Sequence, residues 1–252
     1  MKTIFLASAA AAALFAAPAM AQQAIGSVGV TYSNPSVDFG PVDADADVWT
    51  VDGTVAMPAA DWTVTLNGAI DYAKAFGEDD TTGAAAAHLT KLWTSDVRAG
   101  GFVAASGIGT GDTAWTVGAE AQKYLAGSTL TGLVAYTDAD DLGAKVWTVG
   151  GDAAFYVMPN VRLNAGVSYN NVDTDLGDAD AWTYGVGGEY EFTGTPFSVA
   201  AGYTRADLGD IDVDVDTWSV GLRYSFGGGL QARDRAGAGL GVSAITSVLG
   251  AF

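Results

Sequence analysis

The sequence predicts an all-β chain: a single transmembrane antiparallel up-and-down β-barrel of about twelve strands, after a cleaved signal peptide. Three observations lead to this fold class. Apolar residues alternate with small or polar ones in one segment after another, these segments are about 10–12 residues long, and aromatic residues stand near both of their ends. Strands of soluble proteins are usually shorter, about 5–6 residues, whereas a tilted strand needs about 9–11 residues to cross a bilayer.

The N-terminal segment has the features of a secretory signal peptide. Lys2 precedes a short apolar run, and Ala19-Met20-Ala21 fits a small-residue cleavage site. The run is too short for a spanning helix. We therefore expect residues 1–21 to be removed, residues 22–226 to form the barrel, and residues 227–252 to form a tail in the periplasm or folded into the lumen.

The chain is strongly acidic and has no cysteine. It contains 29 Asp and Glu against 11 Lys and Arg, a formal net charge of −18. The absence of cysteine excludes disulfides and thiolate metal sites, and the negative charge argues against a nucleic-acid partner. We expect no cofactor and no EF-hand site, because the cluster at residues 43–47 lacks the pattern of an EF-hand loop. We expect the acidic loops to be solvated, and binding of divalent cations that bridge to lipopolysaccharide is the alternative.

Alternation bounded by turn residues assigns the strands in order. They cover Ala24–Ser33, Ala46–Met57, Trp62–Ala73, Thr82–Trp93, Val97–Gly107, Thr113–Tyr124, Thr129–Asp138, Lys145–Tyr156, Val161–Val172, Ala181–Phe192, Phe197–Asp207 and Val215–Phe226. Tight turns follow the even-numbered strands, and longer segments rich in Asp follow the odd-numbered ones. Antiparallel hairpins therefore gather the tight turns at one end and the acidic segments at the other. The fourth strand, GAAAAHLTKLW, fits the pattern least well.

A tryptophan motif opens most even-numbered strands, as in VWTVDGTV, AWTVGAEA and TWSVGLRY. The motif fixes which residues share a face: the tryptophan face is bulky and apolar, and the opposite face is mostly Gly, Thr, Ser and Asn. A soluble barrel would normally present many Lys and Glu on its polar face. We therefore expect the bulky face to meet lipid and the polar face to surround a lumen. A secreted soluble β-sandwich or solenoid is the alternative.

The aromatic residues are expected to form two girdles at the membrane interfaces, where amphipathic rings are favoured. The girdle at the acidic end comprises Trp49, Trp115, Trp147, Trp182, Trp218, Tyr72, Tyr136, Tyr169 and Tyr203. The girdle at the tight-turn end comprises Trp62, Trp93, Phe192, Phe197 and Phe226.

The predicted lumen carries charges of both signs. The candidate pore-lining residues are Arg98, Arg162 and Arg223, with Glu120, Asp152, Glu189 and Glu191 as their expected opposite partners. Opposed charges in a channel set up a transverse field that orients solutes and tunes ion preference. Ion pairs that only fill the lumen and stabilise the barrel are the alternative, and the two roles are compatible.

The stretch from Thr217 to Phe226 resembles the closing strand of Gram-negative outer-membrane proteins, with Tyr224 and Phe226 at the two aromatic positions of their assembly signal. Residues 221–235 also resemble the end of alphaproteobacterial porin-like proteins. The resemblance implies insertion into the outer membrane by the outer-membrane assembly machinery, among lipid and lipopolysaccharide. In that family the signal usually ends the chain, whereas here a tail follows.

The tail divides into two parts. GGGLQARDRAGAGLG is expected to be flexible and basic. VSAITSVLGAF places its apolar residues on one face of a short helix, which could lie in the periplasm, on the membrane or in the lumen as a plug. A disordered tail is the alternative.

These features favour a porin for passive diffusion of small hydrophilic solutes or ions through a narrow, water-filled lumen, with a mild preference for cations. The alternative is a plugged or pore-less barrel with a structural or adhesion role. A barrel lipid hydrolase is a further alternative, but the only histidine, His88, has Thr90 where the serine of that active-site pattern would stand. No enzyme activity is therefore expected.

Overall fold

A computed structural model describes residues 24–38, 43–75, 78–108, 112–139, 143–174, 177–209 and 213–240. The expected signal peptide (residues 1–21) and the apolar end of the tail (residues 242–252) lie outside these ranges. No helix among the described residues has the length and apolar character needed to span a bilayer.

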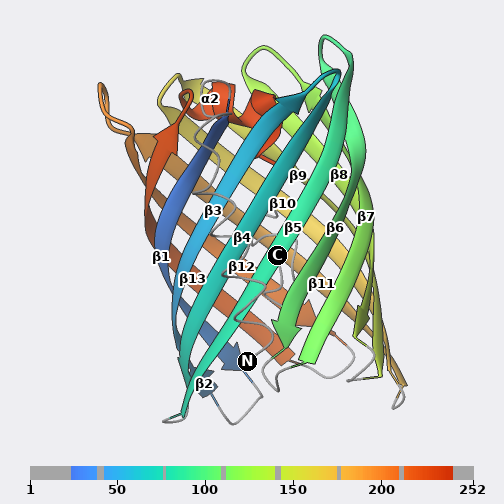
Figure 1. Cartoon of the computed structure of the whole chain (residues 1–252). Helices are drawn as coiled ribbons and strands as arrows, with labels where there is room; N and C mark the ends of the chain where they lie inside the picture. The colour runs from blue at the N-terminus through green and yellow to red at the C-terminus, as the bar shows by residue number, and fades with distance from the viewer. Residues whose placement is uncertain are drawn as a thin grey trace.

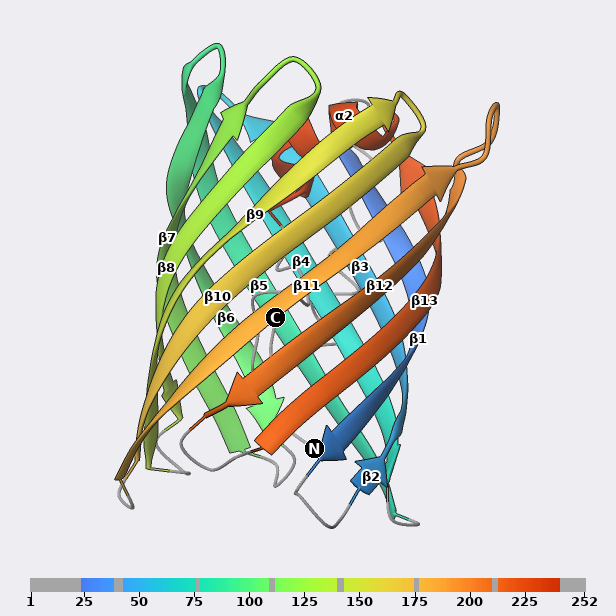
Figure 2. The same cartoon turned by 180° about the vertical axis from the view of Figure 1, so that it is seen from behind.

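Twelve long antiparallel strands form a closed barrel, and each pairs with its neighbours in chain order (Figures 1 and 2). They are β1 (Ile25–Asp38), β3 (Asp47–Ala59), β4 (Trp62–Ala75), β5 (Glu78–Thr94), β6 (Val97–Ile108), β7 (Asp112–Tyr124), β8 (Ser128–Ala139), β9 (Ala144–Met158), β10 (Val161–Thr174), β11 (Gly177–Glu191), β12 (Phe197–Leu208) and β13 (Val213–Phe226). The pairing of β13 with β1 closes the ring, so that neither strand is left with an open edge. The predicted fold class is confirmed.

One short extra strand, β2 (Asp43–Asp45), pairs with the last residues of β1. It was not predicted, because three residues are too few to show an alternating pattern. The strands also extend further at this end than the alternation indicates: β5 begins at Glu78 rather than Thr82, and β11 at Gly177 rather than Ala181. Ladder pairing continues there among polar residues, so apolar alternation does not mark the strand ends.

The two ends of the barrel differ, as the hairpin pattern predicts. We call the end with the tight turns the turn end and the other the loop end. In Figure 1 the tight turns stand at the top, together with the short helix α2 (Leu230–Arg233), and β2 lies at the bottom. Gly227, at φ +82°, reverses the chain after β13 and directs it into the turn end.

The bulky face points outward. The five repeat tryptophans expose between 50% and 66% of their surface, while the residues beside them on the same strands, such as Thr116, Thr148 and Thr183, are buried. Cross-strand rings pack in tilted pairs at the loop end, for example Tyr203 with Trp218, whose centroids lie 4.7 Å apart. The barrel is therefore apolar outside and polar inside.

Candidate functional site: the barrel lumen

The lumen contains a cavity of about 430 Å³. It reaches from Ser33 and Thr217 in the loop half down to Leu230 and Gly239 of the C-terminal tail. Its walls are formed by the inward-facing side chains of the strands. Because successive side chains point to opposite faces, the outward tryptophans of the repeat identify the residues that face inward. Small side chains and glycines, among them Gly187 and Gly202, leave the space that larger inward residues would fill.

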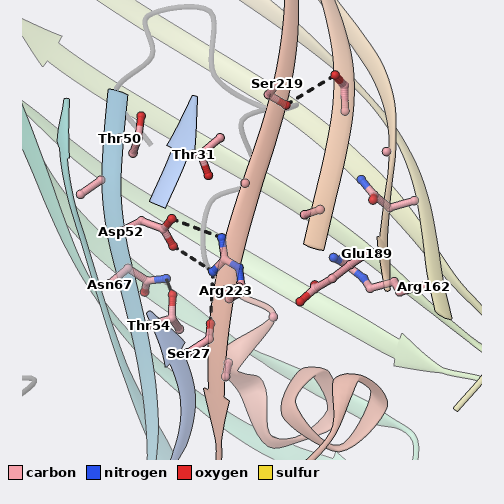
Figure 3. A pocket seen from close by; sticks show the side chains of 18 of the residues that line it. Ser27, Thr31, Thr50, Asp52, Thr54, Asn67, Arg162, Glu189, Ser219 and Arg223 are labelled. Carbon is pink, nitrogen blue, oxygen red and sulfur yellow. Dashed lines mark hydrogen bonds and ion pairs between the residues drawn. The ribbon is translucent and has the colours of Figure 1, made fainter. Parts of the chain in front are cut away.

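One wall of the cavity carries an ion pair at its centre (Figure 3). Arg223 of β13 donates to both carboxylate oxygens of Asp52 of β3, at 2.8 and 3.2 Å, and to the hydroxyl of Ser27 at 3.1 Å. The two strands are not neighbours, since β1 runs between them. Gly29 of β1 pairs with both residues in the ladder, and a Cβ there would lie 3.0 Å from Asp52 Oδ1. The absence of a side chain at Gly29 lets the charges meet across the strand.

We expect Asp52→Asn to lower the free energy of unfolding by about 1–2 kcal/mol, because Arg223 loses its charged acceptor while three quarters of its side chain is shielded. Urea unfolding in lipid vesicles measures this. Asp61→Asn is the matched control, since Asp61 pairs with Lys91 but its side chain is 81% exposed, and exposed pairs contribute little. Equal stability of the two variants would contradict the prediction.

A second wall carries Asp152, Arg162, Asn164 and Glu189, from β9, β10 and β11. In Figure 3, Arg162 and Glu189 lie on the side of Arg223 away from Asp52. In the described part of the chain no carboxylate lies within ion-pair distance of Arg162, and its Nε is buried without a hydrogen-bond partner. Asp152 faces the same space. This wall thus offers both signs of charge to a solute.

The tail forms the floor of the cavity at the turn end. Arg233 of α2 pairs with Glu189 at 2.7 Å and also donates to Ser225. Asp234 opens the π-helical turn η2 (Asp234–Ala238) and accepts hydrogen bonds from Tyr156 at 2.8 Å and Gln122 at 3.4 Å. The stretch expected to be flexible is therefore folded over Leu230–Ala238, because lumen side chains supply partners that the sequence alone does not reveal.

Arg98 of β6 holds the other side of the tail. Its guanidinium donates to Tyr124 at 2.9 Å, to Thr63 at 2.7 Å, to Thr90 at 3.1 Å and to the backbone carbonyl of Arg235 at 3.1 Å. Only 3% of Arg98 is exposed, and all four acceptors are neutral. Arg98 thus sits inside the barrel wall beneath the tail rather than on the open cavity.

A buried pair lies in the same half of the barrel. His88 Nδ1 and Glu120 Oε1 are 2.8 Å apart, and the imidazole stacks on Phe102 with ring centroids 5.2 Å apart. His88 is 2% exposed and faces the interior, and its Nε2 has no hydrogen-bond partner. The only histidine of the sequence therefore lies inside the barrel and not on its lipid-facing surface.

The structure places the candidate pore-lining residues on the inward face but pairs them differently from expectation. The sequence predicts that Arg98, Arg162 and Arg223 form ion pairs with the four candidate carboxylates. Instead Arg223 pairs with Asp52, Glu189 with Arg233 and Glu120 with His88. Glu191 lies beside the start of the tail, where a Cβ on Gly229 would be 3.3 Å from its Oε1. The alternation in VDGTV places Asp52 on the inward face, so the sequence could have identified it as a lumen residue. Arg233 and Asp234 lie in the tail, where no alternating pattern indicates which side chains face the lumen.

The predicted girdle residues lie on the outer face near the two ends of the strands. At the loop end, two tyrosine hydroxyls of the girdle donate to carboxylates, Tyr72 to Asp79 at 2.7 Å and Tyr169 to Asp180 at 2.6 Å. Tyr32, which was not among the predicted girdle residues, donates to Asp47 at 2.5 Å in the same way. On β5 and β6 no aromatic residue completes the girdle at this end, which matches the departure of GAAAAHLTKLW from the repeat. The acidic end therefore begins directly beyond the aromatic rings.

Residues 7–226 match the model of the outer membrane protein beta-barrel domain family, which covers most of the chain. The chain belongs to this family. As an outer-membrane β-barrel, the protein resides in the outer membrane, as the closing-strand pattern predicts. None of the curated proteins matches its sequence.

Solved structures share the fold of this outer-membrane barrel at low identity. The KdgM porin superposes with a TM-score of 0.57 at 12% identity, over 79% of this chain and 99% of that one. An outer-membrane channel from Pseudomonas putida F1 gives 0.58 at 13% identity, over 81% and 95% of the chains. The translocator domain of the autotransporter NalP from Neisseria meningitidis gives 0.52 at 12% identity, over 89% and 99%. At these identities the similarity shows the fold alone. Membership of the alphaproteobacterial porin-like family stays a prediction.

Proposed function

We propose that this outer-membrane barrel lets small hydrophilic solutes or ions diffuse passively through a narrow, water-filled lumen, with a preference for cations. The cavity of about 430 Å³ between two charged, polar walls is the observation that carries the proposal. Twelve strands lie between the eight of side-chain-filled barrels and the 16–18 of wide porins, which suits a narrow passage. The similarity to a porin and to an outer-membrane channel supports the same class of function.

The partners follow from the same proposal. Lipid and lipopolysaccharide surround the apolar outer wall, and the outer-membrane assembly machinery recognises Tyr224 and Phe226. Phe226 also closes the barrel, because it pairs with Gly26 and its ring covers that residue. The tight turns and the tail then face the periplasm, and the acidic clusters face outward from the cell.

Conductance of the full chain in planar bilayers under a KCl gradient tests the function. We expect discrete current steps and a reversal potential of the sign given by cation preference. A folded barrel that never conducts, either as the parent chain or with the tail contacts removed in Arg233→Ala/Asp234→Ala, would overturn the proposal. Steps with anion preference would overturn the cation preference alone.

Neutralising an acidic cluster should weaken that preference. In a variant with Asp43, Asp45 and Asp47 all changed to Asn, we expect the reversal potential to move toward zero at about 0.1 M salt and to differ little from the parent at 1 M, where the Debye length falls to about 3 Å. Asp61→Asn together with Asp96→Asn, in tight turns at the other end, is the control. An unchanged reversal potential at low salt would show that the loop charges do not set selectivity.

A plugged barrel is a second candidate, favoured by the tail that crosses the turn end. If the plug is permanent, the role is structural. If it can leave, the two candidates describe two states of one channel.

A further inference from the structure

The described part of the tail lies across the turn-end mouth of the barrel. Its hydrogen bonds reach strands on opposite sides of the ring: Glu189 and Ser225 on β11 and β13, and Thr65, Arg98 and Gln122 on β4, β6 and β7. A segment of eleven residues, Leu230 to Leu240, joins these points. Because both sides are contacted at once, the segment spans the mouth between them. Figures 1 and 2 show α2 at this end of the barrel.

Polar contacts hold the segment more than apolar packing does. The ion pair between Arg233 and Glu189 is buried, and the second oxygen of Glu189 accepts from Ser198 at 2.6 Å. Among apolar side chains of the segment, only Leu230, Ala238 and Leu240 are buried. When the segment leaves, its hydrogen bonds to the wall are replaced by hydrogen bonds to water. The net free energy lost is about 0.5–1.5 kcal/mol for each neutral bond and about 1.5–3 kcal/mol for each bond to a charged group. The segment is therefore stable in its bound position but can also dissociate from the wall.

The backbone next to the segment can act as a hinge. Gly227, Gly228 and Gly229 follow Phe226 directly, and Gly227 already adopts φ +82°. The helix α2 has only four residues, and η2 bends at Gly237 with φ +95°. Such short helical pieces are not stable alone, so their form depends on the contacts with the barrel wall. The closing strand remains intact on the other side of the hinge.

We propose that Leu230–Leu240 is a reversible plug that closes the turn-end mouth, is latched by Arg233 and Asp234, and swings out about Gly227–Gly229 to open the lumen. The proposal rests on the proposed channel function and adds its regulation. In the closed state Arg233 binds Glu189, and Asp234 binds Tyr156 and Gln122. In the open state these wall residues face water and line the pore.

The latch is tested by changing the tail alone. In Arg233→Ala/Asp234→Ala, the wall and the closing strand are untouched, and four side-chain contacts of the plug are lost. We expect the fraction of time spent in the open level, measured in planar bilayers, to rise about tenfold or more. Gln231→Ala is the matched control on the same helix, since Gln231 makes one exposed contact with the carbonyl of Ala126.

A cross-link tests movement in a single molecule. A Cβ at position 237 would lie 3.5 Å from Cγ2 of Thr63, within reach of a disulfide. The protein has no cysteine, so Thr63→Cys/Gly237→Cys introduces only this pair. Oxidised protein should stay at the closed level, and a thiol reductant added to the same channels should restore opening. Because both readings come from one variant, backbone strain at position 237 does not affect the comparison.

Three outcomes are distinct. More frequent opening in the Arg233 and Asp234 variant, with locking by the cross-link, supports the plug. Equal conductance in parent, variant and oxidised cross-link overturns the plug but leaves the channel function standing. Absence of conductance in all of them, in folded protein, overturns both.

Discussion

Gly100→Ala is expected to prevent stable closure of the barrel. Gly100 of β6 pairs with Thr90 of β5, and a Cβ added there would lie 2.0 Å from the backbone carbonyl oxygen of Leu89 and 2.7 Å from Cα of Thr90. These are backbone atoms of the neighbouring strand and cannot turn aside. The two strands would have to separate, and unpaired backbone groups in hydrocarbon cost several kcal/mol each.

We expect the free energy of unfolding in lipid vesicles to fall by at least about 3 kcal/mol in Gly100→Ala, with loss of the heat-modifiable folded band on gels. Gly132→Ala on β8 is the matched control, because its nearest atom, the carbonyl oxygen of Gly150, is 3.9 Å away. If both variants unfold at the same urea concentration, the prediction that β5 and β6 approach too closely for a side chain at position 100 is contradicted.

Arg98→Ala is expected to have the second-largest effect. The guanidinium satisfies two threonines, one tyrosine and one tail carbonyl inside the wall, so its removal leaves four acceptors without their donor and a void beneath the tail. Loss of such buried, charge-assisted bonds costs about 3 kcal/mol. The tail should also loosen, since Arg98 contacts both the Arg235 carbonyl and the Gly237 turn.

Two measurements check this variant. Urea unfolding gives the loss of stability, and brief trypsin treatment of folded protein reports release of the tail at Arg233 and Arg235. Arg162→Ala is the control, because Arg162 faces the lumen without an ion pair in the described part of the chain. Stability and tail cleavage that match the control would show that Arg98 does not anchor the tail.

The alternating pattern was sufficient to predict the barrel because lipid and lumen impose opposite chemistry on successive residues. Even β5, where alanines replace the tryptophan motif, keeps this phase: Leu89 is exposed and His88 buried. The strand ends were not predictable, since beyond the aromatic girdle both faces meet water. The three residues of β2 are too short for any periodic signal.

The lumen was predictable in composition but not in pairing. Inward phase identifies Arg98, Arg223 and Glu189 as lumen residues, yet which charge meets which depends on contacts across or beyond neighbouring strands. The Asp52–Arg223 pair needs Gly29 between its strands, and the Arg233–Glu189 pair needs the chain to reverse after Phe226. Such contacts follow from three-dimensional arrangement rather than from spacing along the chain.

The central claim is that the bulky face meets lipid while the polar face encloses the lumen. All seven tryptophans lie on the outer face, with exposed fractions from 38% to 66%. Tryptophan emission of the full chain in vesicles of brominated lipid, compared with aqueous iodide, measures this directly. We expect strong quenching by brominated lipid and weak quenching by iodide. Tryptophan emission that brominated lipid does not quench, from protein that stays soluble without detergent, would contradict the claim.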